Sequence, residues 1–377
     1  MDLFGLETPC LVLDRGKMEK NISSLHARMK DLGVNLRPHG KTAKNIDVLA
    51  LAIAGQSGGI TVSTLKEAEY YFDHGIRDIV YAVGIAPVKL DRIVALIKKG
   101  ANIQIILDSI EQVRFTAAKA EEYSLKIPVL IELDCDGHRS GVTADDSLLL
   151  DIGKAAHNAN SLELAGVLTH AGASYQTESI EQIRAVARAE REMAVSSSKI
   201  LLKNDLPCPI VSVGSTPTAY FAEDFTGVTE VRAGVFVFND LVMAGLGVCD
   251  AGDIAISVLI SVIGHQKKKG WVITDGGWMA MSRDRGTAAQ KIDQGYGLVC
   301  DVEGRPFKDL IVSSTNQEHG IIADREGRAV DWEAFKIGSV VRILPNHACG
   351  TAAMFDRYYV TDGTTEIVDV WHRINGW

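Results

Sequence analysis

An alternation of short apolar runs with longer helix-patterned stretches, repeated from about Val34 to Asp240, constrains this chain most. Continuous apolar runs predict strands buried on both faces, as in a parallel sheet covered by helices. Eight such units predict an α/β fold, a (β/α)8 TIM-type barrel. An open doubly wound sheet is the alternative, and it is weaker because no Gly-x-Gly-x-x-Gly turn follows the first run. The runs are Val34–Gly40, Gly59–Thr64, Asp78–Val83, Ile103–Asp108, Pro128–Asp134, Leu162–His170, Pro209–Ser215 and Val228–Phe238.

The sequence pattern changes at about Leu246, and no long helix-patterned stretch follows. Short runs between Gly, Asp and Asn turns predict a second, mostly β domain. We expect the strand Pro9–Asp14, which is surplus to the eight, to pair there. The expected domains are therefore a barrel over residues 15–245 and a β-domain from residues 1–14 and 246–377. The β-domain runs are Ala255–Gly264, Gly270–Thr274, Gly295–Val302 and Val340–Leu344.

Charge and composition exclude several classes of protein. The net charge of −9 argues against nucleic acid as a partner, since phosphate neutralisation needs clustered Lys and Arg. No apolar run is long enough to cross a membrane, and the first residues lack the pattern of a secretory signal. The six cysteines are scattered, which favours a reducing cytoplasm over a disulfide framework.

Lys41 stands where the first predicted strand ends, in Arg37-Pro38-His39-Gly40-Lys41-Thr42. Catalytic groups of such barrels lie at the carboxyl ends of the strands. An amine walled there by apolar neighbours would be a nucleophile able to form a Schiff base. The alternative is an ordinary surface lysine on a loop.

Two later strand ends carry residues suited to an anion. In Asp134-Cys135-Asp136-Gly137-His138-Arg139-Ser140-Gly141, Arg139 could hold an anionic oxygen or pair with a neighbouring Asp. Gly214, Ser215 and Thr216 supply donors before a helix start, which suits a phosphate. An ordinary N-cap, which needs only one of the hydroxyls, is the alternative. Gly234, which follows Arg232 closely, could share the phosphate.

His347 and Cys349 form a third candidate site, in Pro345-Asn346-His347-Ala348-Cys349. On an extended segment, side chains two positions apart point to one face. Imidazole and thiolate together suit a divalent ion such as zinc, although a buried His beside a buried Cys is the alternative. His170 could be a site residue or a core histidine with its hydrogen bonds satisfied. Tyr175 could lie over the flat ring of a ligand or could pack against the protein.

Seven segments in this order resemble the D-serine dehydratase and D-threonine aldolase branch of the alanine-racemase-fold pyridoxal-phosphate enzymes. The resemblance runs over nearly the whole chain. Gly277–Asp284 and the terminal Gly376-Trp377 further resemble the members that dehydrate 3-hydroxyaspartate. The seven segments are Arg37–Thr42, Gly59–Thr64, Asp136–Gly141, Thr169–Gly172, Gly214–Pro217, Arg232–Gly234 and Pro345–Cys349.

The resemblance implies an alanine-racemase-like fold, a homodimer and a role for each candidate residue. It makes Lys41 the Schiff-base lysine of pyridoxal 5'-phosphate. Family members carry a larger aliphatic residue where Gly40 stands, which leaves the packing around Lys41 open. His347 and Cys349 match the ligands of a divalent metal, which could be zinc, manganese, magnesium or cobalt. The other cofactor-binding positions are Arg139 near the phenolic oxygen, Tyr175 in the pocket, Gly214, Ser215 and Thr216 at the phosphate, and Arg232 toward the ring nitrogen.

The implied reaction is a lyase reaction on D-3-hydroxy amino acids. Lys41 would take the Cα proton, and the metal would help the 3-hydroxyl to leave. Dehydration of D-threo-3-hydroxyaspartate or D-serine then gives a 2-oxo acid and ammonia. The alternative is a D-threonine aldolase, which gives glycine and an aldehyde; aldolases of the family pair His with Asp, so Cys349 favours dehydration. A racemase and a non-catalytic cofactor-binding protein are less favoured.

Overall fold

The computed structural model describes residues 1–56, 59–137 and 139–377, so His138 of the motif at the fifth strand end lies outside the described residues. The chain divides into two compact units. One consists of Leu25–Gly234 with Gly376–Trp377, and the other of Met1–Ser24 with Val235–Asn375. Helix α1 (Arg15–Asp31) runs from one into the other.

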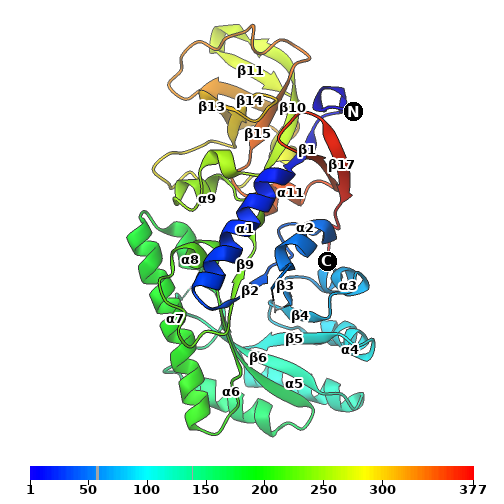
Figure 1. The fold of residues 1–377 in the computed structure, drawn as a ribbon, viewed down its shortest axis with the longest axis vertical. Helices are drawn as coiled ribbons and strands as arrows, with labels where there is room; N and C mark the ends of the chain where they lie inside the picture. Colours follow the sequence, from blue (N-terminus) through cyan, green and yellow to red (C-terminus); the bar gives the residue numbers. More distant parts are fainter. Residues whose placement is uncertain (57–58, 138) are drawn as a thin grey trace. The chain divides into compact units, whose positions relative to one another are not determined.

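The first unit contains eight parallel strands among its described residues (Figure 1). Their order is β2-β9-β8-β7-β6-β5-β4-β3, and a bridge between His39 and Thr61 continues β2 toward β3. The sheet is therefore a nearly closed parallel barrel. All eight predicted runs form strands, and only the last is much too long, because Val235–Val237 turns into a 3-10 helix. The strands are β2 (Asn35–Pro38), β3 (Ile60–Val62), β4 (Asp78–Tyr81), β5 (Asn102–Leu107), β6 (Ile127–Leu133), β7 (Leu162–Thr169), β8 (Ile210–Val213) and β9 (Glu230–Ala233).

Helices join these strands, and Figure 1 shows α4 to α7 outside the sheet. Most begin at a side chain that accepts a hydrogen bond from the first turn, which stabilises the helix start. These caps are Asn45, Thr64, Ser109, Asp146, Ser179 and Ser215. The helices are α2 (Ile46–Ile53), α3 (Leu65–Asp73), α4 (Leu90–Lys98), α5 (Ile110–Glu122), α6 (Ser147–Asn158), α7 (Ile180–Lys203) and α8 (Thr216–Phe221).

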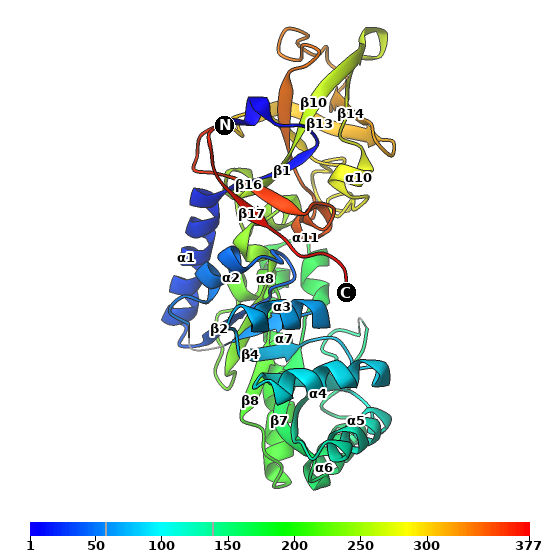
Figure 2. The same ribbon diagram turned by 90° about the vertical axis from the view of Figure 1, so that its right-hand side faces the viewer.

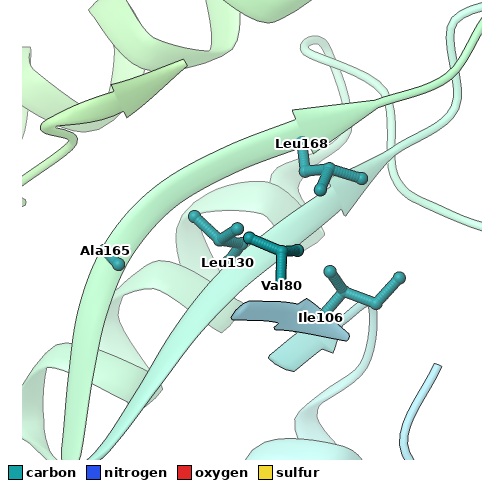
Figure 3. Close-up of a cluster of buried hydrophobic side chains, with 5 residues drawn as sticks. All are labelled: Val80, Ile106, Leu130, Ala165 and Leu168. Atoms are coloured by element: carbon teal, nitrogen blue, oxygen red, sulfur yellow. The ribbon is translucent and has the colours of Figure 1, made fainter. Parts of the chain in front are cut away.

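The strand register lines the barrel with both apolar and charged side chains. Residues opposite each other in register share a face, as Ile106 of β5 and Leu130 of β6 do. An apolar cluster lies on four neighbouring strands, namely Val80, Ile106, Leu130, Ala165 and Leu168 (Figure 3). The buried Arg37 donates to Glu230 at 2.7 Å and to Asp78 at 3.0 Å, so these three charges are paired.

The second unit is built on a nine-stranded sheet, ordered β11-β14-β13-β12-β15-β10-β1-β16-β17. Strand β11 also pairs with β10, which closes the first six strands into a barrel. The predicted strand at Pro9–Asp14 pairs here as expected, and Figure 2 shows β1 beside β16. The strands are β1 (Cys10–Asp14), β10 (Ile256–Gln266), β11 (Trp271–Thr274), β12 (Leu298–Cys300), β13 (Pro306–Thr315), β14 (Gly320–Asp324), β15 (Val340–Leu344), β16 (Arg357–Thr361) and β17 (Ile367–His372).

Short helices interrupt the second unit, so it is mostly rather than entirely β. They are α9 (Leu241–Gly245), α10 (Trp278–Met281) and α11 (Ala348–Ala352). Among the described residues of both units, no helix combines the length and the apolar character that a membrane span requires.

Candidate functional site

Lys41 lies on the turn that follows β2, at the carboxyl end of the barrel. Its backbone N–H donates to His39 Nδ1 at 3.3 Å. Its side chain is exposed, so the apolar neighbours that we expected to surround the amine do not bury it. The reason is that β2 ends at Pro38, which places Lys41 on the loop beyond the strand.

Two histidines near Lys41 are held neutral. Burial lowers the pKa of His39 well below its usual range, and the charges of Lys41 and Arg232 lower it further. Burial likewise lowers the pKa of His170 to about 3, although its Nδ1 hydrogen-bonds to Gly214 O at 2.8 Å. Because His39 Nδ1 accepts from Lys41, its Nε2 carries the proton and donates to Ser63 Oγ at 3.2 Å.

The positive charges that act on these histidines come from three different strand ends. Lys41, Arg139 and Arg232 all depress the pKa values of both His39 and His170. The structure thus brings together residues that the sequence places far apart. These positive charges favour an anion, and the carboxylates of Glu132 and Glu190 offset part of the charge of Arg232.

The hydroxyls of Ser215 and Thr216, in the loop after β8, differ in their hydrogen bonding. Ser215 is the N-cap of α8, since its Oγ accepts from Thr218 N at 3.2 Å, and it also lies 2.8 Å from Ser174 Oγ. Ser215 therefore caps the start of α8. The buried Thr216 Oγ1, in contrast, has no hydrogen-bond partner among the described residues. A buried polar atom of this kind is expected to meet a ligand or water.

Gly214 and Gly234 allow the backbone segments at this end of the barrel to approach closely. Gly214 has a φ of +136°, and a Cβ there would lie 2.2 Å from Arg232 O. A Cβ on Gly234 would lie 3.0 Å from Thr42 Oγ1 and 3.1 Å from His39 Cβ. Both positions therefore favour glycine for steric reasons, whether or not a ligand binds.

Arg232, Arg139 and Tyr175 complete the predicted cofactor set. The buried Arg232 donates to Ser212 Oγ at 2.6 Å and to Thr169 O at 2.5 Å, which engages both terminal nitrogens. Arg139 is exposed on the loop after β6. The ring of Tyr175 lies 6.2 Å from the ring of His170, centroid to centroid.

Gly40 is explained by the buried Tyr71. A Cβ at position 40 would lie 2.5 Å from the Tyr71 ring, and the Tyr71 hydroxyl donates to Gly40 O at 2.9 Å. In this chain the aromatic ring takes the space next to the lysine turn that a larger residue would need.

Glu190 is a site residue that sequence reasoning missed. It is buried in α7, and its Oε1 accepts from Ala171 N at 3.0 Å and from Gly214 N at 2.8 Å. Burial raises the pKa of Glu190, while these N–H donors favour its charged form. One carboxylate thus joins the loop after β7 to the loop after β8. The signal was available, because Glu190 falls at the core-facing spacing of Ile183, Ala187 and Ala194.

Replacing this carboxylate should destabilise the barrel. Glu190→Ala leaves two buried backbone N–H groups without an acceptor, and each costs about 1–3 kcal/mol. We expect the free energy of unfolding to fall by about 2–6 kcal/mol in a denaturant titration. Glu192→Ala is the control, since Glu192 lies on the same helix and is exposed. Equal stability of the two variants would contradict the role given to Glu190.

His347 and Cys349 lie where β15 leads into α11. The extended segment expected here is wrong, because His347 is the N-cap of α11 and Cys349 lies in its first turn. Their side chains nevertheless contact each other through a hydrogen bond. The buried Asp240 fixes this turn by accepting from Ala348 N at 3.0 Å and from Met243 N at 2.9 Å.

Asp284 is a second residue near these candidates to which the sequence analysis gave no role. Its Oδ2 lies 2.6 Å from His347 Nδ1. Burial lowers the pKa of His347, but the hydrogen bonds to Asp284 and Cys349 outweigh it and raise the pKa to about 11. Among residues 1–56, 59–137 and 139–377, no group of three or more His, Cys, Asp or Glu side chains is arranged to hold a metal. The pair His347 and Cys349 would therefore leave most coordination positions open.

Two family models match the chain. One is described as alanine racemase, N-terminal domain, and matches residues 13–241. The other is described as a putative serine dehydratase domain and matches residues 255–361.

Two curated relatives align along almost the full chain. The D-threo-3-hydroxyaspartate dehydratase of Delftia sp. (strain HT23) is 50% identical over 100% of this chain and 99% of its own. The 3-hydroxy-D-aspartate aldolase of Paracoccus denitrificans (strain Pd 1222) is 28% identical over 98% of this chain and 92% of its own.

Solved structures are similar over the same length. The structure of the Delftia dehydratase covers 100% of both chains with a TM-score of 0.97 and 49% identity. A cysteine-to-alanine mutant of D-threo-3-hydroxyaspartate dehydratase, solved in the metal-free form, has the same TM-score, identity and coverage. Alanine racemase of Clostridium difficile 630 has a TM-score of 0.68 at 15% identity, covering 97% of this chain and 98% of its own, and shares the fold alone.

Proposed function

Because the chain belongs to the alanine racemase family, we propose that it is a pyridoxal-phosphate-dependent dehydratase of D-3-hydroxy amino acids. Its branch of the family contains the D-serine dehydratases and D-threonine aldolases. The observation that carries the proposal is the set of contacts at the barrel's carboxyl end. There Lys41 N donates to His39 Nδ1 at 3.3 Å, and His170 Nδ1 lies 2.8 Å from Gly214 O, in the loop that also carries the unpartnered Thr216 Oγ1. The full-length similarity to a dehydratase at 50% identity supports it.

The cluster fits the cofactor on three counts. Three cations suit its anionic groups, the free Thr216 Oγ1 suits a phosphate oxygen, and Lys41 offers a primary amine. Pyridoxal phosphate, when bound, supplies the electron sink for a carbanion at Cα. We assign Lys41 to the Schiff-base linkage, Gly214, Ser215 and Thr216 to the phosphate, and Arg139 and Tyr175 to the ring. Arg232 and Gly234 would line the same site, with Arg232 toward the ring nitrogen.

Lys41 and its neighbours have different roles in the transfer of the Cα proton. The Lys41 amine accepts the Cα proton of the substrate, which is general base catalysis. His39 and His170 stay neutral near it, so they add no further charge to repel a protonated Lys41. The three cations hold anionic groups in place while the proton moves.

The donor set at His347 and Cys349, an imidazole and a thiolate, fits a divalent ion such as zinc. When bound, such an ion supplies Lewis-acid help to the departure of the 3-hydroxyl. A D-threo-3-hydroxyaspartate dehydratase solved in the metal-free form is a cysteine-to-alanine mutant, which supports a cysteine such as Cys349 as a ligand here.

The alternative function is an aldolase, favoured by the similarity to 3-hydroxy-D-aspartate aldolase. Aldol cleavage needs a base for the 3-hydroxyl proton, which a carboxylate could supply and a thiolate holding a metal would not. We therefore expect Cys349→Asp to lower ammonia release at least tenfold and to raise the share of aldehyde product. Chromatography of both products measures this. An unchanged product ratio would contradict the role given to the thiolate.

A panel of D- and L-3-hydroxy amino acids tests the proposed function. We expect ammonia and 2-oxo acid from D-threo-3-hydroxyaspartate or D-serine, and none from the L enantiomers. Release from no D-substrate in the presence of cofactor and metal would contradict it, and would favour a racemase or a non-catalytic cofactor-binding protein.

The remaining assignments follow from the family. We propose that the nearly closed parallel barrel is a (β/α)8 barrel of TIM type, with the cofactor domain over residues 15–245 and the β-domain over the rest. We also propose a homodimer with a small-molecule substrate. All six cysteines are free, which supports a reducing cytoplasm.

A further inference from the structure

Asp284 reaches His347 from a loop outside the His-x-Cys segment. Asp284 Oδ2 and His347 Nδ1 are 2.6 Å apart, a short hydrogen bond. A carboxylate only accepts, so the ring nitrogen that faces it carries the hydrogen. A metal ion that displaces the proton of Nε2 leaves Nδ1 protonated toward Asp284, so the lone pair that faces the ion lies on Nε2.

We propose that Asp284 is the positioning residue of the metal site, selecting the His347 tautomer that presents Nε2 to the ion beside Cys349. The inference rests on the metal assignment of the proposed function. A carboxylate behind a ligating histidine fixes its tautomer and ring orientation and raises its basicity. No role in metal binding follows for Asp284 from the sequence motifs alone.

The loop that carries Asp284 is fixed at both ends. Asn346, the residue before His347, donates from Nδ2 to Asp284 O at 3.1 Å and to Gly295 O at 2.7 Å. Thr351 of α11 donates to Met281 O at 2.9 Å. The backbone around Asp284 is therefore tied to the turn that holds His347 and Cys349.

The close packing of the two segments agrees with this arrangement. A Cβ on Gly350 would lie 3.2 Å from Ser282 Oγ and 3.6 Å from His347 Nδ1. Asp284 N donates to Ser282 Oγ at 3.2 Å, which orients the aspartate within its loop. These contacts hold the Asp284 loop and the turn that carries His347 in a fixed arrangement.

The test compares metal affinity in Asp284→Asn and Asp284→Glu with the unaltered full-length holoenzyme. Each protein is stripped of metal and titrated with Zn²⁺ against a chromogenic chelator. We expect Asp284→Asn to bind Zn²⁺ about 10–100-fold more weakly. Partial recovery is expected in Asp284→Glu, which restores the carboxylate. The absorption band of the bound cofactor should be unchanged in both.

Asp301→Asn is the matched control. Asp301 lies in the same unit and pairs with Arg305 at 2.7 Å, and its replacement should leave the affinity unchanged. A Co²⁺ titration adds a second readout, because the thiolate-to-metal band should persist in Asp284→Asn if Cys349 still ligates.

Three outcomes would overturn the inference. Affinity in Asp284→Asn equal to that of the unaltered protein would show that the carboxylate does not position His347. A loss as large as that in Cys349→Ala would make Asp284 a ligand instead. An equal loss in Asp301→Asn would show a general effect of acidic residues. If the unaltered protein binds no metal, the metal assignment of the proposed function fails first.

Discussion

Lys41→Ala is expected to abolish ammonia release, with a loss of about 10⁴-fold or more in kcat. The substitution removes both the amine that attaches the cofactor and the base for the Cα proton. The two roles fall on one side chain, so no neighbouring group substitutes for it. His39 and His170 lie nearby and are held neutral by burial and by adjacent cations. Neither can replace Lys41, because an imidazole does not form a Schiff base.

Borohydride labelling distinguishes this result from simple misfolding. Reduction of the unaltered protein with bound pyridoxal phosphate should fix the cofactor on the peptide that contains Lys41. Lys44→Ala is the control, because Lys44 lies in the same turn but pairs with Glu67 at 3.3 Å. Label on Lys44, or full activity in Lys41→Ala, would contradict the assignment.

Removal of the metal is expected to cost about 10³-fold in dehydration rate, since Lewis-acid help with a leaving group is worth several kcal/mol. His347→Ala and Cys349→Ala should give the same loss. The cofactor should remain bound and yellow in all three cases, because its proposed contacts involve neither residue.

Cys249→Ala is the control for the cysteine, since Cys249 belongs to the same compact unit but lies away from the His-x-Cys turn in sequence. Activity should return when Zn²⁺, Mn²⁺ or Co²⁺ is added to the chelated protein. Full activity in a metal-free preparation would contradict a metal-dependent step.

Much of the barrel could be predicted from the sequence because its signals are local. Buried parallel strands need continuous apolar runs, and each helix start needs a cap such as Ser109 or Ser179. Apolar runs and helix caps can both be recognised from a few consecutive residues. The predicted strands also placed Lys41, Arg139 and Gly214 in loops at the carboxyl ends of strands.

The contacts that organise the site could not be predicted in the same way. Glu190 meets Ala171 and Gly214 only after α7 packs on the barrel, so no short motif contains the three together. Asp284 reaches His347 from 63 residues away. Even the side-chain direction of Cys349 depended on α11, which begins where the sequence suggested an extended segment.

The product mixture from D-threo-3-hydroxyaspartate tests the central claim most directly. Incubated with cofactor and a divalent metal, the unaltered protein should release oxaloacetate and ammonia in equal amounts, with little glycine or glyoxylate. Both pairs are quantified from one reaction. Glycine and glyoxylate as the main products would contradict the dehydratase assignment and establish the aldolase instead.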